Sequence, residues 1–189
     1  MKKKIAIVFF SQQGAVRLLA HSIAEGIHSQ GVEIELLEVL GQDINAGRYQ
    51  NDELLNTIDH CDAVIFGSPT YMGAPASQFK AFMDASSDKY AVKAWRNKLA
   101  SGFTAGGSIN GDQQQTLASF ITLACQHGML WAGMDTSEHT DDLGLNRTGA
   151  SLGLVASPDK NSQVHPVDLD TAFYHGQRVA NLINQGDAL

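Results

Sequence analysis

Residues 5–27 read IAIVFFSQQGAVRLLAHSIAEGI, and this stretch decides the fold class. Its first six residues, Ile5 to Phe10, are all apolar, which is typical of a strand covered on both faces, as in a parallel sheet. From Ala15 onward, apolar residues recur at intervals of three and four, which predicts an amphipathic helix. A buried strand, a tight loop and a helix in this order indicate an α/β protein.

The loop between this strand and this helix is a candidate anion site. In an open α/β sheet such a loop lies at the ligand crevice, and the helix after it directs unpaired N–H groups and the positive end of its dipole there. Ser11 adds a hydroxyl donor, and Gly14 has no side chain to keep a phosphate from the backbone. A plain capping turn is the alternative. The residues expected to hold a phosphate are Ser11, Gln12, Gln13, Gly14, Ala15 and Val16.

Composition narrows the possible classes of protein. The chain has 189 residues, of which 43% are hydrophobic and 17% charged, so we expect one domain over residues 1–189. A formal net charge of -7 argues against nucleic-acid binding, which relies on clustered Lys and Arg. The basic run Lys2 to Lys4 precedes only six apolar residues, so we expect no export signal and no integral membrane segment. Cys61 and Cys125 form no CxxC pattern, which argues against a disulfide framework and fits a reducing cytoplasm.

The alternation of strands and helices continues along the chain. Further strands are expected at Glu33–Val39 (an edge strand), Ala63–Gly67, Leu99–Thr104 and near Leu130. Further helices are expected over Asn51–Ile58, around Phe79–Met83, over Gln113–His127 and over a last stretch with Asp168 as its N-cap. We therefore predict a flavodoxin-like three-layer α/β/α fold with a five-stranded parallel sheet in the order 2-1-3-4-5.

Three loops should converge in this fold, because the first, third and fourth strands are neighbours in the sheet. We expect a ligand with its phosphate at residues 11–16 and a flat apolar body between the other two loops, where Tyr71 and Met72 can stack on a ring. Ordinary turns are the alternative. The residues of these two loops are Thr70, Tyr71, Met72 and Gly73, and Thr104, Ala105, Gly106, Gly107, Ser108 and Ile109.

Four blocks of sequence carry a family resemblance: FSQQGAV (10–16), GSPTYMGAPASQFKAFMD (67–84), KLASGFTAGG (98–107) and QQQTLASFITLACQHGML (113–130). Together they resemble the WrbA type of flavodoxin-like protein, the FMN-dependent NAD(P)H:quinone oxidoreductases, over nearly the whole chain. The resemblance implies FMN as the cofactor in the predicted crevice. It also implies that His127 contacts the flavin and takes part in catalysis, with simple capping of the preceding helix as the alternative. Tyr90 is implied as a substrate-binding residue, with Trp95 as its rival.

The activity implied by the resemblance is two-electron transfer from NAD(P)H through FMN to a quinone, in a homodimer or homotetramer. A flavodoxin-type electron carrier and an NAD(P)H-dependent FMN reductase are the alternatives. The sequence contains neither GxGxxG nor GxxxxGK[ST], which argues against a Rossmann dehydrogenase and a P-loop NTPase.

Two features have no assigned function. Glu138, His139, Asp141 and Asp142 are expected to be a solvated charge cluster, so we predict no metal. Residues 134–153 are expected to cover the ligand, to contact another subunit or to form a plain surface loop.

Overall fold

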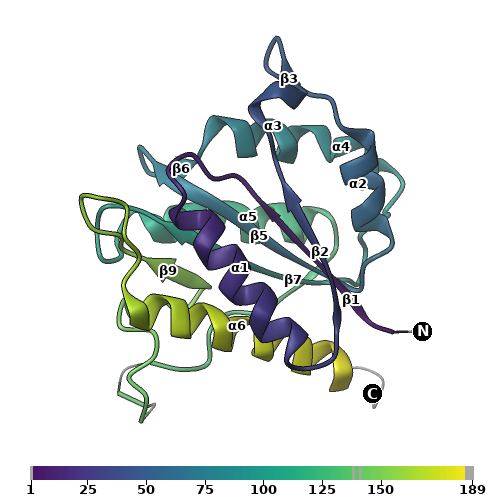
Figure 1. Ribbon diagram of the computed structural model, residues 1–189. Coiled ribbons are helices and arrows are strands. Elements are labelled where there is room, and N and C mark those ends of the chain that lie inside the picture. Colours follow the sequence, from purple (N-terminus) through teal and green to yellow (C-terminus); the bar gives the residue numbers. More distant parts are fainter. Residues whose placement is uncertain (1, 138, 141, 186–189) are drawn as a thin grey trace.

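The computed structural model describes residues 2–137, 139–140 and 142–185. A parallel sheet forms its centre, with the strands in the order β2-β1-β5-β7 and then β8 and β9, which both pair with β7. Helices cover both faces of the sheet (Figure 1). The strands are β1 (Lys4–Phe9), β2 (Glu33–Glu38), β5 (Ala63–Tyr71), β7 (Leu99–Ala105), β8 (Leu130–Trp131) and β9 (Leu154–Ala156).

The helices form the two outer layers. On one face lie α1 (Ala15–His28) and α6 (Pro166–Gln185), and on the other lie α2 (Asp52–Asp59), α3 (Ser77–Ala85), α4 (Ser87–Ala91) and α5 (Gln113–Gln126). The remaining short elements are η1 (Gly41–Asp43), the hairpin of β3 (Ile44–Asn45) and β4 (Arg48–Tyr49), and β6 (Ala74–Pro75), which pairs with the end of β5.

Strand β1 lacks polar alternation because both of its faces are buried. Ile5, Ile7 and Phe9 pack in the core beneath α1 and α6, whereas Ala6 and Val8 belong to the core on the opposite side of the sheet. None of these five residues is more than 2% exposed. The two cores therefore fix β1, and with it the start of the loop that leaves its carboxyl end.

Helices α1 and α6 touch through glycine. A Cβ atom on Gly26 would lie 2.0 Å from the carbonyl oxygen of Phe173, and one on Gly176 would lie 2.1 Å from the carbonyl oxygen of Ile23. Only glycine lets the two backbones approach so closely. This contact fixes α6 against α1, whose first turn borders the site described below.

The predicted flavodoxin-like fold is confirmed, and the strand order differs from the prediction only in detail. The fifth strand is split: β8 pairs with Leu99 and Ala100 at the start of β7, and β9 pairs with Phe103 to Ala105 at its end. The strand expected near Leu130 is thus only two residues long, and β9 was missed. A strand of three residues is too short to give a periodic signal, and its position depends on pairing with β7.

The prediction that Asp168 caps the last helix is wrong. Helix α6 begins at Pro166, whose fixed φ suits the first helical position, and the backbone N–H of Val167 donates to Nδ1 of His165 at 3.2 Å. Asp168 lies inside the first turn and is 1% exposed, so its carboxylate serves another purpose.

None of the described helices is long and apolar enough to cross a membrane. Glu138 and Asp141 of the predicted charge cluster lie outside the described residues. Within the part of the chain that the structure describes, no three His, Cys, Asp or Glu side chains form a group that could hold a metal. Cys61 is buried, Cys125 is exposed, and both are free thiols.

Candidate functional site

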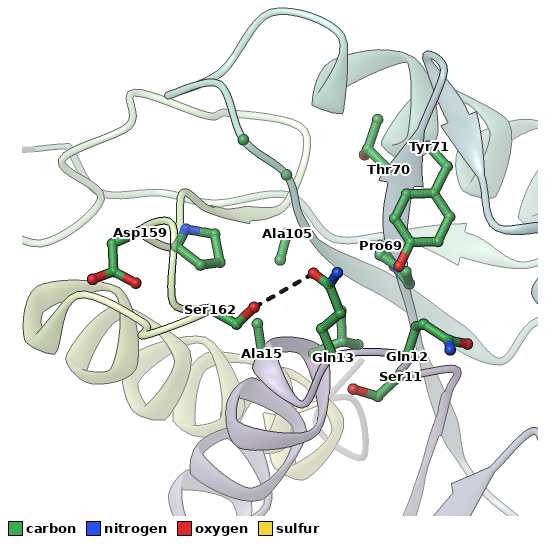
Figure 2. Close-up of a pocket in the computed structure, with 14 residues that line it drawn as sticks. Ser11, Gln12, Gln13, Ala15, Pro69, Thr70, Tyr71, Ala105, Asp159 and Ser162 are labelled. Atoms are coloured by element: carbon green, nitrogen blue, oxygen red, sulfur yellow. Dashed lines mark hydrogen bonds between the residues drawn. The ribbon is translucent and has the colours of Figure 1, made fainter.

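A cleft with a volume of about 240 Å³ opens where β1, β5 and β7 end (Figure 2). Residues from all three predicted loops line it, and they are Ser11, Gln12, Gln13, Ala15, Val16, Thr70, Tyr71, Ala105, Gly106 and Gly107. Four further lining residues were not predicted: Pro69, Pro158, Asp159 and Ser162. Among the described residues, no Lys or Arg lines the cleft.

The first turn of α1 borders the cleft with unpaired backbone donors. Gly14 is the residue before the helix, and its φ of 95° is one that residues with a side chain rarely adopt. The hydroxyl oxygen of Ser11 accepts the backbone N–H of Arg17 at 3.2 Å, which satisfies one donor of this turn. The N–H groups of Ala15 and Val16, which have no carbonyl partner within a helix, belong to residues that line the cleft. These donors and the helix dipole make this end of the cleft suitable for an anion.

A chain of threonine hydroxyls supports the middle of the cleft. Thr104 donates to the carbonyl oxygen of Ser68 at 2.7 Å, and its hydroxyl oxygen lies 2.8 Å from that of Thr70, which in turn lies 2.8 Å from that of Thr116. Because each hydroxyl has one hydrogen, Thr116 donates to Thr70 and Thr70 donates to Thr104. Thr70 can therefore offer a ligand only an acceptor. Thr104 is completely buried and does not line the cleft, so its side chain holds Thr70 in place.

The hairpin that joins β5 to β6 forms the rim of the cleft. Tyr71 pairs with Ala74, and the two residues between them, Met72 and Gly73, have φ of 49° and 75°. Positive φ at both positions is typical of a tight two-residue hairpin turn, in which glycine is common and methionine is not. Tyr71 lines the cleft and is 43% exposed, whereas the Met72 side chain is fully exposed and lies outside the lining. Gly73 likewise shapes the turn without lining the cleft.

The loop after β7 packs against the start of α5. A Cβ atom on Gly106 would lie 2.8 Å from Nε2 of Gln113, and this nitrogen donates to the carbonyl oxygen of Ser108. Ser108 and Ile109 lie beyond the lining, and the Ile109 side chain is 62% exposed. The glycine therefore lets a buried glutamine brace the loop.

Three of the four missed residues come from a fourth loop, residues 157–163, which follows β9, whereas Pro69 lies in β5 directly before Thr70. Because β9 pairs with the end of β7, this loop also leaves the carboxyl edge of the sheet. The available signal was the apolar run of residues 152–156 followed directly by Ser, Pro and Asp, a strand and turn pattern.

His127 and Tyr90 lie elsewhere, around a second cavity of about 450 Å³. Lys93, Arg96, Gln126 and Gly128 share its lining. Helix α5 separates this cavity from the cleft, because Thr116 lies near its start and His127 directly after its end. At a rise of about 1.5 Å per residue, about 16 Å lies between these two residues along the helix. Within one chain, the structure does not bring His127 and Tyr90 to the cleft.

The His127 side chain is buried, and burial lowers its pKa to about 4. Its ring stacks on that of Trp95, with centroids 4.3 Å apart, and meets the ring of Tyr90 edge-on at 6.1 Å. Ser86 donates to the carbonyl oxygen of Met83 at 2.7 Å, so Nε2 of His127 donates to the Ser86 hydroxyl at 2.9 Å. His127 is therefore a neutral imidazole with a free Nδ1 acceptor, and its ring does not bind the last carbonyls of α5.

Trp95, the rival of Tyr90, is completely buried, and its indole N–H donates to Asp59 at 2.9 Å. Tyr90 is 56% exposed and lines the second cavity. Of the two aromatic residues, Tyr90 is thus the one that a ligand can reach.

Comparisons with known proteins agree with this fold. A family model described as NADPH-dependent FMN reductase matches residues 4–136. Flavodoxin FldP of Pseudomonas aeruginosa is 36% identical to the chain, with 96% of the chain and 97% of that protein covered. Quinone-oxidoreductase QR2 of Triphysaria versicolor is 31% identical, with 96% of each covered. The crystal structure of a WrbA-like flavodoxin from Agrobacterium tumefaciens superposes with a TM-score of 0.74 at 32% identity, covering 97% of this chain and 99% of that one.

Proposed function

The chain belongs to the NADPH-dependent FMN reductase family, as a WrbA-type flavodoxin-like protein, and on this premise we propose that it is an FMN-dependent oxidoreductase that transfers two electrons from NAD(P)H to a quinone. The observation that carries the proposal is the first turn of α1, whose unpaired donors at Ala15 and Val16 border the cleft. A phosphate monoester needs no lysine or arginine where a helix begins in this way.

The residues present fit FMN. Residues 11–16 would hold its phosphate, and the loops of residues 70–73 and 104–109 would border its ring through the members that line the cleft, Thr70, Tyr71 and residues 105–107. Thr70 would accept a hydrogen bond from a ring N–H group, because its own hydrogen is used by Thr104. Tyr71 would cover an apolar surface of the ring. Bound FMN supplies hydride acceptance from a reduced nicotinamide and two-electron delivery to an acceptor.

The chain's own residues position the reactants. Ser11 fixes the first turn of α1 by accepting the N–H of Arg17, and Gly14 gives the loop the backbone conformation that exposes the next donors. The threonine chain keeps Thr70 in one orientation, so the acceptor that it offers is preorganised. No covalent nucleophile is needed for this reaction.

We place His127 and Tyr90 at the cleft of a second copy of the chain, in a homodimer or homotetramer. Two observations support this arrangement: both residues line a cavity remote from their own cleft, and Tyr90 and the nearby Val92 are 56% and 73% exposed. Lys93 and Arg96 in the same cavity suit the phosphates of a dinucleotide such as NAD(P)H. The neutral His127 would stabilise negative charge by turning its Nε2–H from the Ser86 hydroxyl toward that charge, rather than by obligatory proton transfer.

A reducing cytoplasm is the location that we propose, and the exposed free thiol of Cys125 supports it.

Steady-state kinetics test the proposed reaction. If the nicotinamide leaves before the quinone enters the same site, initial rates with NADH or NADPH against a benzoquinone should give parallel double-reciprocal lines. Intersecting lines would show that both substrates bind together, and no turnover with either nicotinamide would reject the proposed reaction.

The second candidate function is that of a flavodoxin-type electron carrier. It is favoured by the 36% identity to Flavodoxin FldP over nearly the whole length of both proteins. A carrier would exchange electrons with a partner protein but would not be reduced by free NAD(P)H. The two candidate functions therefore differ in one measurable step, the reduction of the bound flavin by free NAD(P)H.

A further inference from the structure

The loop of residues 157–163 closes one side of the cleft and reaches the loop assigned to the phosphate. Pro158, Asp159 and Ser162 line the cleft. The Ser162 hydroxyl donates to the side-chain carbonyl of Gln13 at 3.4 Å, although the two residues are 149 positions apart (Figure 2). This contact lies beside the first turn of α1, at the end of the cleft that suits an anion.

The loop is internally ordered. One carboxylate oxygen of Asp159 accepts the backbone N–H groups of Asn161 and Gln163 at 2.8 and 2.9 Å. The backbone N–H of Asp159 also donates to the carbonyl oxygen of Gln163, and the carbonyl oxygen of Asp159 accepts the backbone N–H of Ser162, each at 3.0 Å. Ser162 has φ of 61°, so its place at the cleft is held in a backbone conformation that non-glycine residues seldom adopt. These hydrogen bonds tie the loop to itself, so its position depends on how its base is held.

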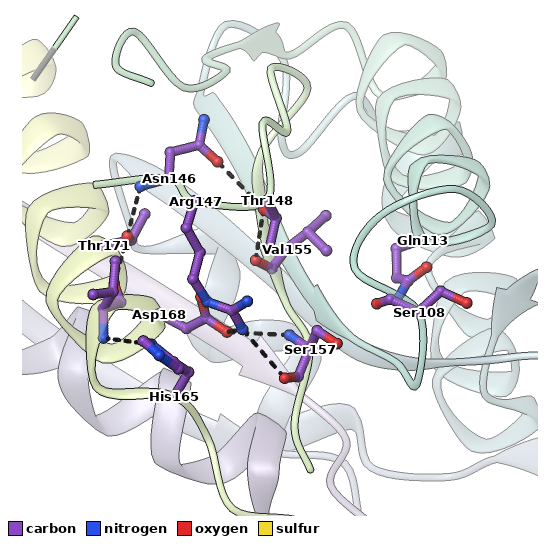
Figure 3. A network of polar contacts seen from close by, with 11 residues as sticks. Ser108, Gln113, Asn146, Arg147, Thr148, Val155, Ser157, His165, Asp168 and Thr171 are labelled. Carbon is purple, nitrogen blue, oxygen red and sulfur yellow. Dashed lines mark hydrogen bonds and ion pairs between the residues drawn. The ribbon is translucent and has the colours of Figure 1, made fainter. Parts of the chain in front are cut away.

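The base of the loop is held by a partly buried ion pair (Figure 3). One carboxylate oxygen of Asp168 accepts the backbone N–H of Ser157 at 3.1 Å and the guanidinium of Arg147 at 2.8 Å. The same nitrogen of Arg147 donates to the carbonyl oxygen of Ser157 at 3.3 Å. The Asp168 side chain is 2% exposed and that of Arg147 is 24% exposed, so the carboxylate is shielded from water and depends on these partners. Ser157 is thus held through both of its backbone polar groups.

The segment that carries Arg147 also touches the loop on the other side of the cleft. Asn110 donates to the carbonyl oxygen of Thr148 at 3.1 Å, and the Thr148 hydroxyl donates to the carbonyl oxygen of Val155 in β9 at 3.1 Å. Asn146 is buried and fixed by donating to the carbonyl oxygens of Thr136 and Ala150. Residues 146–148 therefore brace two walls of one cleft.

We propose that residues 157–163 form a cap over the phosphate end of the cleft, and that Arg147, acting through Asp168 and Ser157, is the positioning residue that holds this cap in place. The proposal rests on the proposed function, in which the cleft holds FMN. The cap touches Gln13 in the phosphate loop and would keep water from the phosphate, so its placement should matter for FMN and little for riboflavin, which lacks the phosphate. Part of the 134–153 segment thereby gains a role in cofactor selectivity.

Limited proteolysis tests the positioning without any flavin. Lys160 is exposed within the cap and offers trypsin a cleavage site. Arg147→Gln and, separately, Asp168→Asn should speed cleavage after Lys160 at least about fivefold at temperatures where each variant remains folded by circular dichroism. The matched control is Lys80→Gln, which removes the exposed ion pair with Asp84 on α3. Cleavage rates in Arg147→Gln equal to those of the wild type and of this control would overturn the proposal.

Flavin selectivity tests what the cap does. Fluorescence titration of FMN and of riboflavin into the full chain, freed of flavin by dialysis, should show that Arg147→Gln raises the Kd for FMN about tenfold and the Kd for riboflavin less than about twofold. Ser162→Ala, which leaves the ion pair intact, should lower the same selectivity by a smaller factor, and Arg147→Lys should restore part of it. Equal losses for both flavins, or no loss for FMN, would overturn the proposal. Wild-type protein that binds neither flavin would reject the proposed function instead, and proteolysis would still decide whether Arg147 positions the loop.

Discussion

Gly14 matters both for the backbone conformation of its loop and for the proposed binding of the ligand. Its φ of 95° is strained for any residue with a side chain, yet a Cβ there would touch no atom within 4 Å. We expect Gly14→Val to cost about 1–3 kcal/mol of local strain and to weaken FMN binding at least about tenfold, because the turn that presents the donors of Ala15 and Val16 is lost. Gln12→Ala should weaken binding less than about threefold, as measured by fluorescence titration. Equal effects of the two substitutions would mean that the loop is only a turn.

His127 is the residue whose role depends on its charge. Because burial lowers its pKa to about 4, it is neutral from pH 6 to pH 8, and we expect quinone turnover over this range to show no titration from it. If the Nε2–H of His127 turns from Ser86 to a charge that develops on the substrate, losing that hydrogen bond costs about 1.5–3 kcal/mol, so His127→Ala should lower turnover per bound FMN about tenfold to a hundredfold. A purely structural role predicts a lower Tm with turnover per flavin unchanged, and measuring both quantities in one variant separates the two readings.

At the scale of the elements, α6 carries a second buried histidine that makes stability depend on pH. His175 is completely buried, and Ser101, which donates to the carbonyl oxygen of Ala132, accepts its Nε2–H at 3.0 Å. Burial, and to a lesser degree Arg178, lowers the pKa of His175 from 6.5 to about 4. The folded state therefore binds fewer protons than the unfolded state, so the stabilisation is complete above pH 6.5 and is lost as the pH falls toward 4.

This loss should be on the order of 3 kcal/mol at pH 4, from His175 alone. We expect His175→Gln to flatten the fall of Tm between pH 6.5 and pH 4, at the cost of a lower Tm at neutral pH. The control is His21→Gln, an exposed position on α1. If Tm falls as steeply between pH 6.5 and pH 4 in the His175 variant as in the wild type, then His175 is not the source of the loss of stability in acid.

The elements that the sequence predicts well are those whose pattern reflects burial along their own length. Both β1 and α1 are of this kind, since the spacing of their own apolar residues shows which positions face the cores. Strand β9 and the 157–163 loop were missed because their place is set by pairing with β7. Asp168 was misread because an acid near a helix start resembles an N-cap, whereas its partner Arg147 lies 21 positions away.

The candidate site, like the fold, was predicted only in part from the sequence. Loops after long buried strands were predicted to meet, and residues of all three line one cleft. The distance of His127 from that cleft also follows from topology, because a helix that connects parallel strands runs antiparallel to them and ends at the opposite edge of the sheet. Family resemblance alone placed His127 beside the flavin, and it contains no information on which copy of the chain supplies it.

For the whole molecule, the single domain over residues 1–189 and the oligomer stay predictions. If His127 and Tyr90 of one copy serve the cleft of another, two impaired variants should complement each other. Gly14→Val has an impaired cleft and His127→Ala lacks the second contribution, so co-expressed mixed oligomers should recover up to about a quarter to a half of wild-type turnover, depending on the number of copies. Size-exclusion chromatography gives the number of copies. If oligomers that are shown to contain both variants recover no turnover, then either the cleft and His127 of the same chain act together, or His127 has no role in turnover.

The central claim is that this cleft holds an FMN that NAD(P)H reduces and a quinone reoxidises. The most direct measurement is the absorption spectrum of the purified, FMN-loaded protein without oxygen, recorded before and after NADH or NADPH is added and again after a benzoquinone is added. The account predicts that the oxidised flavin band disappears with at least one nicotinamide and returns in full with the quinone. A protein that takes up no FMN, or a bound flavin that dithionite reduces but neither nicotinamide does, would contradict it.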